Sequence, residues 1–385
     1  MKSDEKKYPP EATVRKGRIL RIEPFTPTTP ESREVVWLRE SYLKPFASLL
    51  AGKEIAPSFG FAAGTKKRLG NYARFLAVQQ TELEFIPLDI FGKQISDEEL
   101  SHFLTPGLYK DYGAIKRSAR VDDIKGSGVK VRMPDITALS LRLGFKNSLI
   151  IELESPEGAL RQAAKRWLDY LKTLEYSEIN IVRLSTDPSG KARRSIVSGM
   201  DFVIERIANM NIRVSAGNNP HYNPFAVEKV AAYLHSFDPD DPGNRAVVCG
   251  DGAGVYSLAV AGKFPKTVAL ALDEISEKEI AYNARLNGFS NVRIERNIEL
   301  VSEIGSQVEL AVLSELLSFK NSEKLFYDIL ELHPLKIVLL SLSPQTMKET
   351  LSAAFEKGYD LKQFYIFEYI PVEKIALFAA MMERV

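Results

Sequence analysis

The C-terminal part of the chain alternates between short, uninterrupted apolar runs and stretches whose apolar residues recur at helical spacing. Strands are predicted at the apolar runs 245–249, 267–272, 291–295, 308–313, 336–341, 363–370 and 374–382. Helices are predicted between them at 256–262, 277–286, 323–332 and 344–358. Apolar strands separated by helices indicate a parallel sheet that is buried on both faces. The last two strands have no helix between them, so the predicted fold class is α/β, an open doubly wound sheet with a terminal antiparallel hairpin.

The middle of the chain mixes a helix with hairpin-like strands. Residues 148–154 predict a strand, 158–174 a helix and 179–186 a second strand, and a turn-rich segment then leads to a strand near 195–197. A strand–helix–strand unit followed by a hairpin predicts an α+β layer in which a helix covers one face of a sheet. The Pro-, Asp- and Gly-rich segment 237–244 is the strongest boundary signal in the chain.

These patterns divide the chain into three parts. Residues 1–57 are a charged, Pro-rich N-terminal extension with one helical pattern at 35–50, residues 58–236 are an α+β central domain, and residues 237–385 are the doubly wound domain. No apolar run approaches the roughly 20 residues that cross a bilayer. The N-terminus lacks the apolar segment of a signal peptide. The cytoplasm is therefore the expected location, and no membrane partner is expected.

The composition is that of a globular protein, with 45% hydrophobic and 26% charged residues in a chain of 385. This length provides cores that need no metal or disulfide for stability. The single cysteine, Cys249, excludes an internal disulfide, an iron–sulfur cluster and a multi-thiolate zinc site. The histidines are not spaced as metal ligands, so no metal site is expected. The net charge of +1 gives no global argument for nucleic acid, which local patches alone can supply.

A glycine-rich turn, Gly250-Asp251-Gly252-Ala253-Gly254, follows the first predicted strand of the doubly wound domain and opens a helix. Glycines let the backbone turn tightly and approach a ligand closely. The G-x-G-x-G spacing differs from the dinucleotide form, and it fits a turn beneath the nucleoside and amino-acid parts of S-adenosyl-L-methionine (SAM). Asp273, at the end of the second strand, can accept hydrogen bonds from two ribose hydroxyls. The alternative is purely structural, with Asp251 as a turn residue and Asp273 as a helix cap.

Several segments between residues 140 and 385 resemble the RNA uracil-C5 methyltransferases, which are SAM-dependent and have a Rossmann-like, class I methyltransferase domain. The matching segments are 209–234, 247–261, 284–296 and 332–378, and their order and spacing are specific. The resemblance implies a class I methyltransferase sheet and SAM as the cofactor. It places His221 at the position of the family's cofactor-side glutamine and Asn223 at the position of its asparagine.

The resemblance breaks at the two motifs that carry the family's chemistry. The family's nucleophilic cysteine lies in an S-C-N-P motif, and the matching residues here are Ser341-Leu342-Ser343-Pro344. Leu342 therefore stands where a thiolate would add to the uracil ring, and uracil-C5 chemistry is not expected. The family's D-P-P-R motif matches the Ser-Glu-Leu-Leu segment at 314–317. Glu373 matches the region of the family's general-base glutamate, with a solvated carboxylate as the alternative.

RNA is the partner that the resemblance implies. Basic clusters at 65–68 and 116–120 occur in the central domain, and Phe103, Tyr109 and Tyr112 lie near the second of them. Aromatic rings among cations are compatible with phosphate contacts and with stacking on unpaired bases. Solvated surface charge is the alternative for both clusters.

The sequence leaves two main functions open. The first is a SAM-dependent methyltransferase with an RNA or small-molecule nitrogen or oxygen as acceptor and Glu373 as base. The second is a non-catalytic protein of the methyltransferase fold that binds RNA or a protein partner. A non-catalytic subunit of a larger homo-oligomeric enzyme is a third, and the sequence does not fix the oligomeric state.

Overall fold

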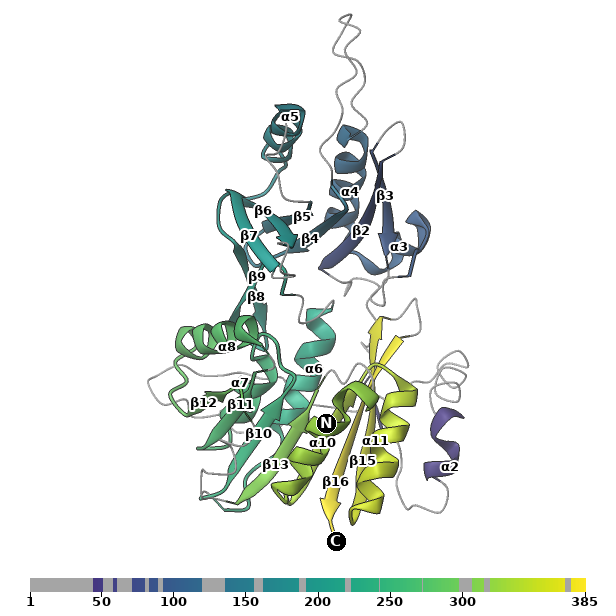
Figure 1. Ribbon diagram of the computed structural model, residues 1–385, viewed down its shortest axis with the longest axis vertical. Coiled ribbons are helices and arrows are strands. Elements are labelled where there is room, and N and C mark those ends of the chain that lie inside the picture. Colours follow the sequence, from purple (N-terminus) through teal and green to yellow (C-terminus); the bar gives the residue numbers. More distant parts are fainter. Residues whose placement is uncertain are drawn as a thin grey trace, which may run out of the picture. The chain divides into compact units, whose positions relative to one another are not determined.

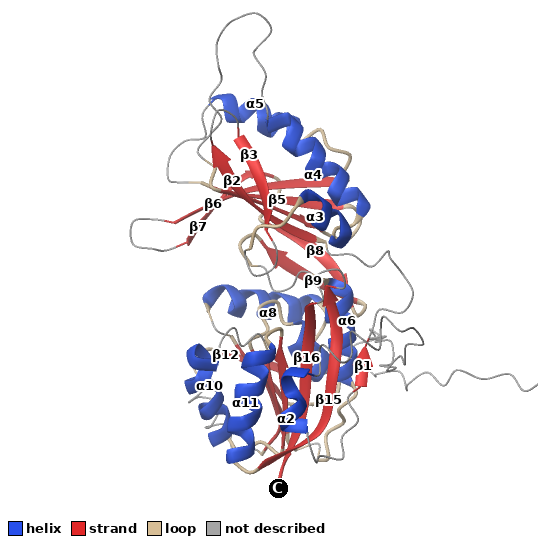
Figure 2. Cartoon of the chain, turned by 90° about the vertical axis from the view of Figure 1, so that its right-hand side faces the viewer, coloured by secondary structure: helices blue, strands red, loops and turns tan. Residues whose placement is uncertain are grey.

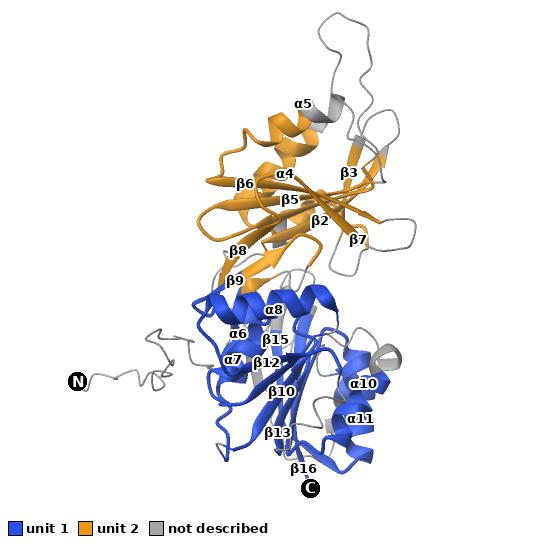
Figure 3. Ribbon diagram, turned by 60° about the vertical axis from the view of Figure 1, so that its left-hand side comes forward, with its two compact units in different colours: residues 1–65, 207–212, 225–385 blue, residues 66–206, 213–224 orange. Residues whose placement is uncertain are grey.

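The structure is a computed structural model, and the described residues are 44–50, 58–60, 71–79, 83–88, 93–119, 136–155, 162–186, 192–218, 223–241, 243–271, 273–297, 307–314, 319–370 and 375–385. The chain forms two compact units, which Figure 3 distinguishes by colour. Unit 1 comprises residues 1–65, 207–212 and 225–385, and unit 2 comprises residues 66–206 and 213–224.

Unit 1 is built on an eight-stranded sheet with the order β1-β15-β16-β14-β13-β10-β11-β12 (Figure 1). Its strands are β1 (Ser58–Gly60), β10 (Arg245–Cys249), β11 (Thr267–Leu270), β12 (Val292–Glu295), β13 (Val308–Leu313), β14 (Lys336–Ser341), β15 (Tyr359–Ile370) and β16 (Ile375–Arg384). Neighbouring strands are parallel, except that β16 runs antiparallel to both β14 and β15. The predicted α/β sheet with a terminal antiparallel hairpin is confirmed.

Helices cover both faces of this sheet, which explains why its central strands are apolar along their whole length. The helices are α2 (Ala47–Leu50), α6 (Pro224–His235), α7 (Val255–Ala261), α8 (Glu274–Leu286), α10 (Phe319–Glu331) and α11 (Pro344–Glu356), and a short 3-10 helix, η1, spans Lys44–Phe46. Residues of η1, α10 and α11 share one core cluster with the sheet, including Phe46, Phe326 and Leu351. Figure 2 shows α6 on the side of the sheet opposite to α10 and α11.

Helix α6 and the segment 237–244, which precede β10, belong to unit 1. The ring of Tyr233, on α6, lies 4.6 Å from that of Tyr365 on β15. The segment 237–244 is held by the buried carboxylate of Glu309, which accepts a hydrogen bond from the backbone N–H of Asp240 at 2.7 Å. Both α6 and this segment therefore lie in unit 1. The last part of unit 1 begins at residue 225, before the segment 237–244 whose composition signals a boundary.

The N-terminal residues that the structure describes complete unit 1. β1 pairs in parallel with residues 365–367 of β15 at the edge of the sheet. Phe46 is fully buried, and its ring centroid lies 5.0 Å from that of Phe364 and 5.1 Å from that of Phe378. The helical pattern expected in this region is described only in its last part, as η1 and α2, and its earlier residues lie outside the described ranges.

Unit 2 contains a six-stranded sheet of order β3-β2-β4-β5-β6-β7, and a two-stranded sheet, β8-β9, follows it in the chain. The strands are β2 (Tyr72–Gln79), β3 (Leu83–Leu88), β4 (Ala138–Leu143), β5 (Ser148–Glu154), β6 (Glu178–Thr186), β7 (Ala192–Ser198), β8 (Phe202–Ile207) and β9 (Met210–Ser215). β5 and β6 are parallel and are connected through α5 (Gln162–Leu171), while the other pairs of the larger sheet are antiparallel. The predicted strand–helix–strand unit followed by a hairpin is confirmed.

The two faces of the six-stranded sheet bury different kinds of residue. The first face packs on helices, among them α4 (Pro106–Ala119), whose Tyr112 ring stacks on Phe75 at 4.3 Å; α3 (Asp97–Phe103) precedes α4. The opposite face carries a buried ion pair, in which Arg142 of β4 lies 2.9 Å from Glu205 of β8. Glu152 of β5 is also buried there, and loss of hydration raises its pKa to about 6. Charged pairs therefore hold β8 against the sheet.

Candidate functional site

The strand order of unit 1 places a topological switch point at β10. β10 lies between β11 and β13, so the chain leaves β10 toward one side of the sheet and later returns to the other side. Open α/β sheets bind ligands at such a point, beyond the carboxyl ends of the strands. The glycine turn follows directly on β10 at this end of the sheet.

Two of the three glycines in the turn are required by backbone geometry. Gly250 has φ +80°, and a Cβ there would lie 2.0 Å from the carbonyl oxygen of Ser314. Gly254, which precedes α7, has φ +87° and would place a Cβ 3.3 Å from the backbone of Ile280. Only glycine adopts this left-handed backbone without strain. These residues let the turn pack tightly against the end of β13 and against α8, and Gly252 lies half-buried between them.

Asp251 stabilises the start of α7 from inside the turn. Its carboxylate accepts a hydrogen bond of 2.6 Å from the backbone N–H of Ser257. Burial raises the pKa of this carboxyl to about 6, although the backbone donors around it oppose the shift. The geometry fits the structural alternative for Asp251, and its contact with a cofactor stays a prediction.

Asn283 fastens the turn to the neighbouring helix. Its side-chain amide, on α8, donates a 2.8 Å hydrogen bond to the carbonyl oxygen of Ala253, and both residues are fully buried. Sequence reasoning did not identify Asn283. The available signal was an amide among the apolar positions of an amphipathic helix, which is typical of a buried residue that bonds to backbone.

Asp273 is the N-cap of α8, as the structural alternative for it stated. Its carboxylate accepts a 2.7 Å hydrogen bond from the backbone N–H of Ser276, and its side chain is exposed. A capping carboxylate uses one oxygen for this bond, and the second oxygen retains lone pairs that can accept hydrogen bonds from a ligand. The ribose contact of Asp273 stays a prediction.

Ser314 contributes a buried hydroxyl that lacks a hydrogen-bond partner among the described residues. Its residue is 3% exposed, it directly follows β13, and its backbone N–H donates to the carbonyl of Cys249 at 2.9 Å. A buried hydroxyl without a partner costs free energy unless a ligand or water satisfies it. Ser314 stands beside the glycine turn, at the position of the aspartate in the D-P-P-R motif, so this hydroxyl fits a bound polar ligand.

Two of the predicted site residues, His221 and Glu373, lie outside the described residues, so their roles stay predictions. Asn223 is described and is buried immediately before α6.

The S-C-N-P position forms a capped turn without a free nucleophile. The hydroxyl of Ser343 caps α11 by accepting a hydrogen bond from the backbone N–H of Thr346 at 3.2 Å. The hydroxyl of Ser341 accepts a hydrogen bond from the backbone N–H of Ser343 at 3.1 Å. Leu342 lies between them and is half-buried. Both hydroxyls therefore serve the local structure of the turn.

The lone thiol is equally unsuited to nucleophilic chemistry. Cys249 is the last residue of β10, is 1% exposed and has its pKa raised to about 12 by burial. A thiol in this state carries almost no thiolate at neutral pH. It packs in the same core cluster as strand residues of β13 and β14.

Tyr112, one of the three aromatic residues whose positions are compatible with stacking on unpaired bases, belongs to the core of unit 2. Tyr112 is 2% exposed, and its hydroxyl donates to the carbonyl of Phe85 and to Asp97. The Lys116 ammonium pairs with Asp97 at 2.7 Å. The expectation that Tyr112 presents a stacking surface is therefore wrong, because α4 turns this ring toward the sheet. The side chain of Phe103 and the basic segment 65–68 lie outside what the structure describes.

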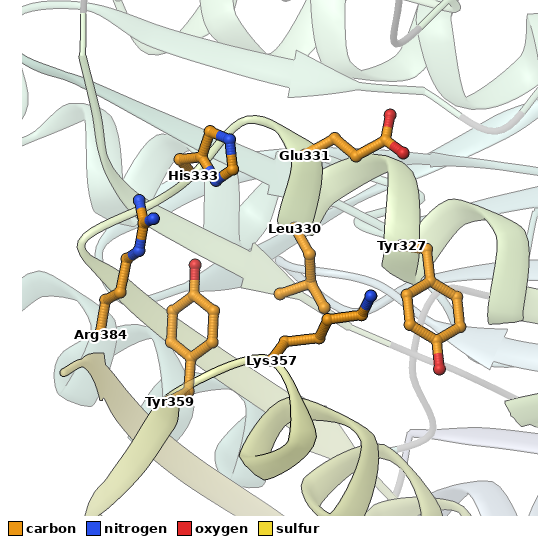
Figure 4. Close-up of a pocket in the computed structure, with 7 residues that line it drawn as sticks. All are labelled: Tyr327, Leu330, Glu331, His333, Lys357, Tyr359 and Arg384. Carbon is orange, nitrogen blue, oxygen red and sulfur yellow. The ribbon is translucent and has the colours of Figure 1, made fainter.

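A cavity of about 190 Å³ opens at another part of unit 1. Figure 4 shows its lining, which consists of Tyr327, Leu330, Glu331, His333, Lys357, Tyr359 and Arg384. His333 and Lys357 follow the C-terminal ends of α10 and α11, where unpaired carbonyl groups carry partial negative charge. Lys357 also lies over the Tyr327 ring, 5.4 Å from its centroid. The Lys357 ammonium has the sign of charge that stabilises a helix C-terminus.

No group of three or more His, Cys, Asp or Glu side chains in the described part of the chain is arranged to hold a metal ion. Among the described helices, none combines the length and apolar character that would let it cross a membrane.

Comparison with known proteins supports a methyltransferase fold. No family model matches the chain. An uncharacterised RNA methyltransferase of Caldanaerobacter subterraneus subsp. tengcongensis is 24% identical over 178 residues, which cover 46% of this chain and 39% of the relative. A tRNA/tmRNA (uracil-C(5))-methyltransferase of Vibrio atlanticus is 25% identical over 233 residues, 55% of this chain and 62% of the relative. The matches thus span less than two thirds of either curated relative.

A solved structure extends the likeness over most of the chain. The tRNA (uracil-54, C5)-methyltransferase of Pyrococcus abyssi, solved in complex with S-adenosyl-L-homocysteine, superposes with a TM-score of 0.64 at 14% identity, covering 90% of this chain and 83% of that one. The sheet order, the antiparallel β16 and the glycine turn at the switch point define a class I methyltransferase fold. Within that class, the chain resembles the RNA uracil-C5 methyltransferases.

Proposed function

We propose that the protein binds SAM at the glycine turn and transfers its methyl group to RNA. The observation that carries this proposal is the turn at the switch point of a class I methyltransferase sheet, beside the buried hydroxyl of Ser314, which has no hydrogen-bond partner among the described residues. The names of the similar proteins, which are RNA methyltransferases, support RNA as the acceptor.

The proposed cofactor site is made of residues from several elements of unit 1. The turn Gly250–Gly254 would hold the adenosyl and amino-acid parts of the cofactor. The carboxylate of Asp273 would accept hydrogen bonds from the ribose hydroxyls. His221 matches, by resemblance, the family's cofactor-side glutamine, and the Ser314 hydroxyl would bond a polar group of the ligand.

The residues present favour a nitrogen or oxygen acceptor. When bound, SAM supplies an electrophilic methyl group on a sulfonium. The acceptor would be a nitrogen or oxygen lone pair, and Glu373, by resemblance to the family's general base, would take the acceptor's proton. Methylation of uracil C5 through a thiolate is not part of the proposal, because Leu342 occupies the cysteine position and Cys249 is buried with a raised pKa.

A non-catalytic binding protein is the second candidate. The observation that favours it is the capped turn at residues 341–343, where both hydroxyls are engaged in local hydrogen bonds. Such a protein would keep the fold, with or without SAM, and bind RNA or a protein.

Calorimetric titration with SAM, followed by a radiolabelled methyl-transfer assay on total RNA, tests the proposal. Binding of SAM together with RNase-sensitive incorporation of label is the expected result. Absence of SAM binding would overturn the cofactor assignment. Binding without any transfer to RNA would favour the non-catalytic protein.

A further inference from the structure

One exposed aromatic ring of unit 2 lies between two cations. Phe145, in the turn between β4 and β5, is 38% exposed. The Lys146 ammonium lies 6.0 Å from its ring centroid, and the Arg206 guanidinium, at the end of β8, lies 5.5 Å from the same centroid. We call Phe145, Lys146 and Arg206 the Phe145 cluster.

Hydrogen bonds of the Phe145 backbone fix the position of this residue in the turn. The N–H of Phe145 donates to the carbonyl of Ile204 on β8. Its carbonyl accepts a 3.0 Å hydrogen bond from the hydroxyl of Ser148. A Cβ on Gly144 would lie 2.9 Å from the Ile204 carbonyl oxygen, so only glycine lets β4 approach β8 this closely. Phe145 is therefore held out at the surface by a turn with satisfied hydrogen bonds.

The rest of the turn makes an unusual choice of residue. Lys146 and Asn147 both have left-handed backbone, with φ of 58° and 57°. Residues other than glycine seldom adopt positive φ, and asparagine does so several times more often than most. Lysine is less favourable there, yet the turn keeps it in place with a bond from the Ser177 hydroxyl to the Lys146 carbonyl. The sequence thus places a cation at the ring at the expense of backbone preference.

The chemistry of the cluster fits a single-stranded nucleic acid. A flat exposed ring can stack on a base, and guanidinium and ammonium groups near it can neutralise the phosphates on either side of that base. Single exposed apolar residues are common, but a ring with two cations within about 6 Å of its centroid is a rarer arrangement. The cations also carry a charge that is complementary to the RNA backbone.

We propose that the Phe145 cluster is an RNA contact that stacks on one unpaired base and binds its flanking phosphates. This inference rests on the proposed function and adds the surface of unit 2 that engages the RNA. It replaces the expectation that Tyr112 provides the stacking ring.

Binding of fluorescently labelled single-stranded RNA of about 12 nucleotides to the full-length protein, followed by anisotropy at several salt concentrations, tests the inference. Phe145→Leu is expected to weaken RNA binding about tenfold without changing its salt dependence. Phe145→Tyr keeps an aromatic ring and is expected to bind RNA as the wild type does. Lys146→Gln and Arg206→Gln are each expected to reduce the steepness of the logarithmic salt dependence by about 0.7. Lys172→Gln, which removes an exposed cation paired with Asp169, is the control that changes neither.

The outcomes separate this inference from the proposed function. If Phe145→Leu and Arg206→Gln bind RNA as well as the wild type does, the inference is overturned and the proposed function stands. Wild-type protein that neither binds nor methylates RNA overturns both. If the wild type binds an acidic peptide and these variants lose the peptide but keep RNA, the cluster is a protein-binding surface. That result also overturns the inference. Thermal unfolding of each variant verifies that the fold is intact.

Discussion

The side-chain amide of Asn283 donates to the carbonyl oxygen of Ala253, 2.8 Å away, and both residues are fully buried. The bond joins α8 to the glycine turn. Since Asp273 caps the same helix, one amide fixes the distance between the turn and the carboxylate that is proposed to hold the ribose. Positioning by a buried hydrogen bond of this kind predicts a loss of cofactor affinity in addition to a loss of stability.

We expect Asn283→Ala to lower the free energy of unfolding by about 1–3 kcal/mol, because the buried carbonyl of Ala253 loses its donor. SAM affinity should fall about tenfold in the same variant, since the turn loses its anchor. Asn291→Ala is the matched control, because its amide donates to the carbonyls of Ala261 and Phe264 at the far end of α7. Urea unfolding and calorimetry measure both quantities. Equal loss of SAM affinity in the two variants would contradict a positioning role.

Ser314→Ala is expected to raise the stability of the ligand-free protein and to weaken its binding of SAM. The hydroxyl has no partner among the described residues, so its removal should stabilise the ligand-free protein by about 1 kcal/mol. The same change should weaken SAM binding about tenfold if the hydroxyl bonds the ligand. Urea unfolding without ligand and calorimetric titration give the two values. A variant that is more stable and binds SAM normally would show that the hydroxyl plays no part in the site.

Two helix caps give a second test of the cofactor site. Asp273→Ser keeps a capping oxygen at α8 and removes the carboxylate, so the unfolding free energy should change little while SAM affinity falls about tenfold. Ser343→Ala removes the cap of α11, and it should lower the unfolding free energy by about 1 kcal/mol without changing SAM affinity. Retained SAM affinity in Asp273→Ser would remove Asp273 from the site and leave it as a cap only.

Asp251 predicts a specific dependence of stability on pH. Its pKa is about 6 in the folded protein and near 4 in the unfolded chain, so the folded state holds the proton more tightly. Between about pH 4 and 6 the unfolded state therefore binds fewer protons, and stability falls as the pH rises through this window. A shift of about two pKa units corresponds to about 3 kcal/mol. Above pH 6 this contribution is constant.

Asp251→Asn should remove that part of the pH dependence. The amide keeps an oxygen that accepts from the N–H of Ser257, and it does not titrate. Urea unfolding of the variant between pH 4 and 7 should show a shallower decline than the wild type. Glu152→Gln is the companion measurement, because Glu152 also has a pKa raised to about 6 and lies in unit 2. An unchanged pH profile in Asp251→Asn would contradict the raised pKa.

Phe46→Ala is expected to destabilise unit 1 by about 3–5 kcal/mol, because it leaves a cavity against Phe364 and Phe378. Phe46→Leu should cost much less, since leucine refills most of that space. Urea unfolding followed by near-ultraviolet circular dichroism reports on the aromatic core. A loss below about 1 kcal/mol in Phe46→Ala would show that the N-terminal residues are only loosely attached to the sheet.

The strands of the large sheet were predictable because burial on both faces makes each of them apolar throughout. The predicted ranges of β10, β13 and β14 coincide with the observed ones. Their side-by-side order was not contained in the pattern, which is local, and it entered through the family resemblance. β1 could not be predicted, because a segment of three residues has no periodicity and its partner lies in the last strands of the chain.

The misplaced stacking residue had a signal that was overlooked. Leu108, Tyr112 and Ile115 recur at helical spacing, which marks one buried face of α4. This periodicity predicts burial of Tyr112, and its proximity in sequence to basic residues does not outweigh that prediction. The sequence contains a signal for burial of Asn283, an amide among apolar helix positions, but its acceptor, the carbonyl of Ala253, is identified only when the elements are assembled. The same holds for the Ser314 hydroxyl, which has no hydrogen-bond partner among the described residues.

The pairing of β1 with β15 has a consequence for biosynthesis. Residues 58–60 leave the ribosome long before their partner strand, β15, and the continuous part of unit 2, residues 66–206, is synthesised between the two. This part of unit 2 can therefore fold while the nascent chain is still growing. The aromatic side chain of Phe46 is enclosed only after translation delivers Phe364 and Phe378.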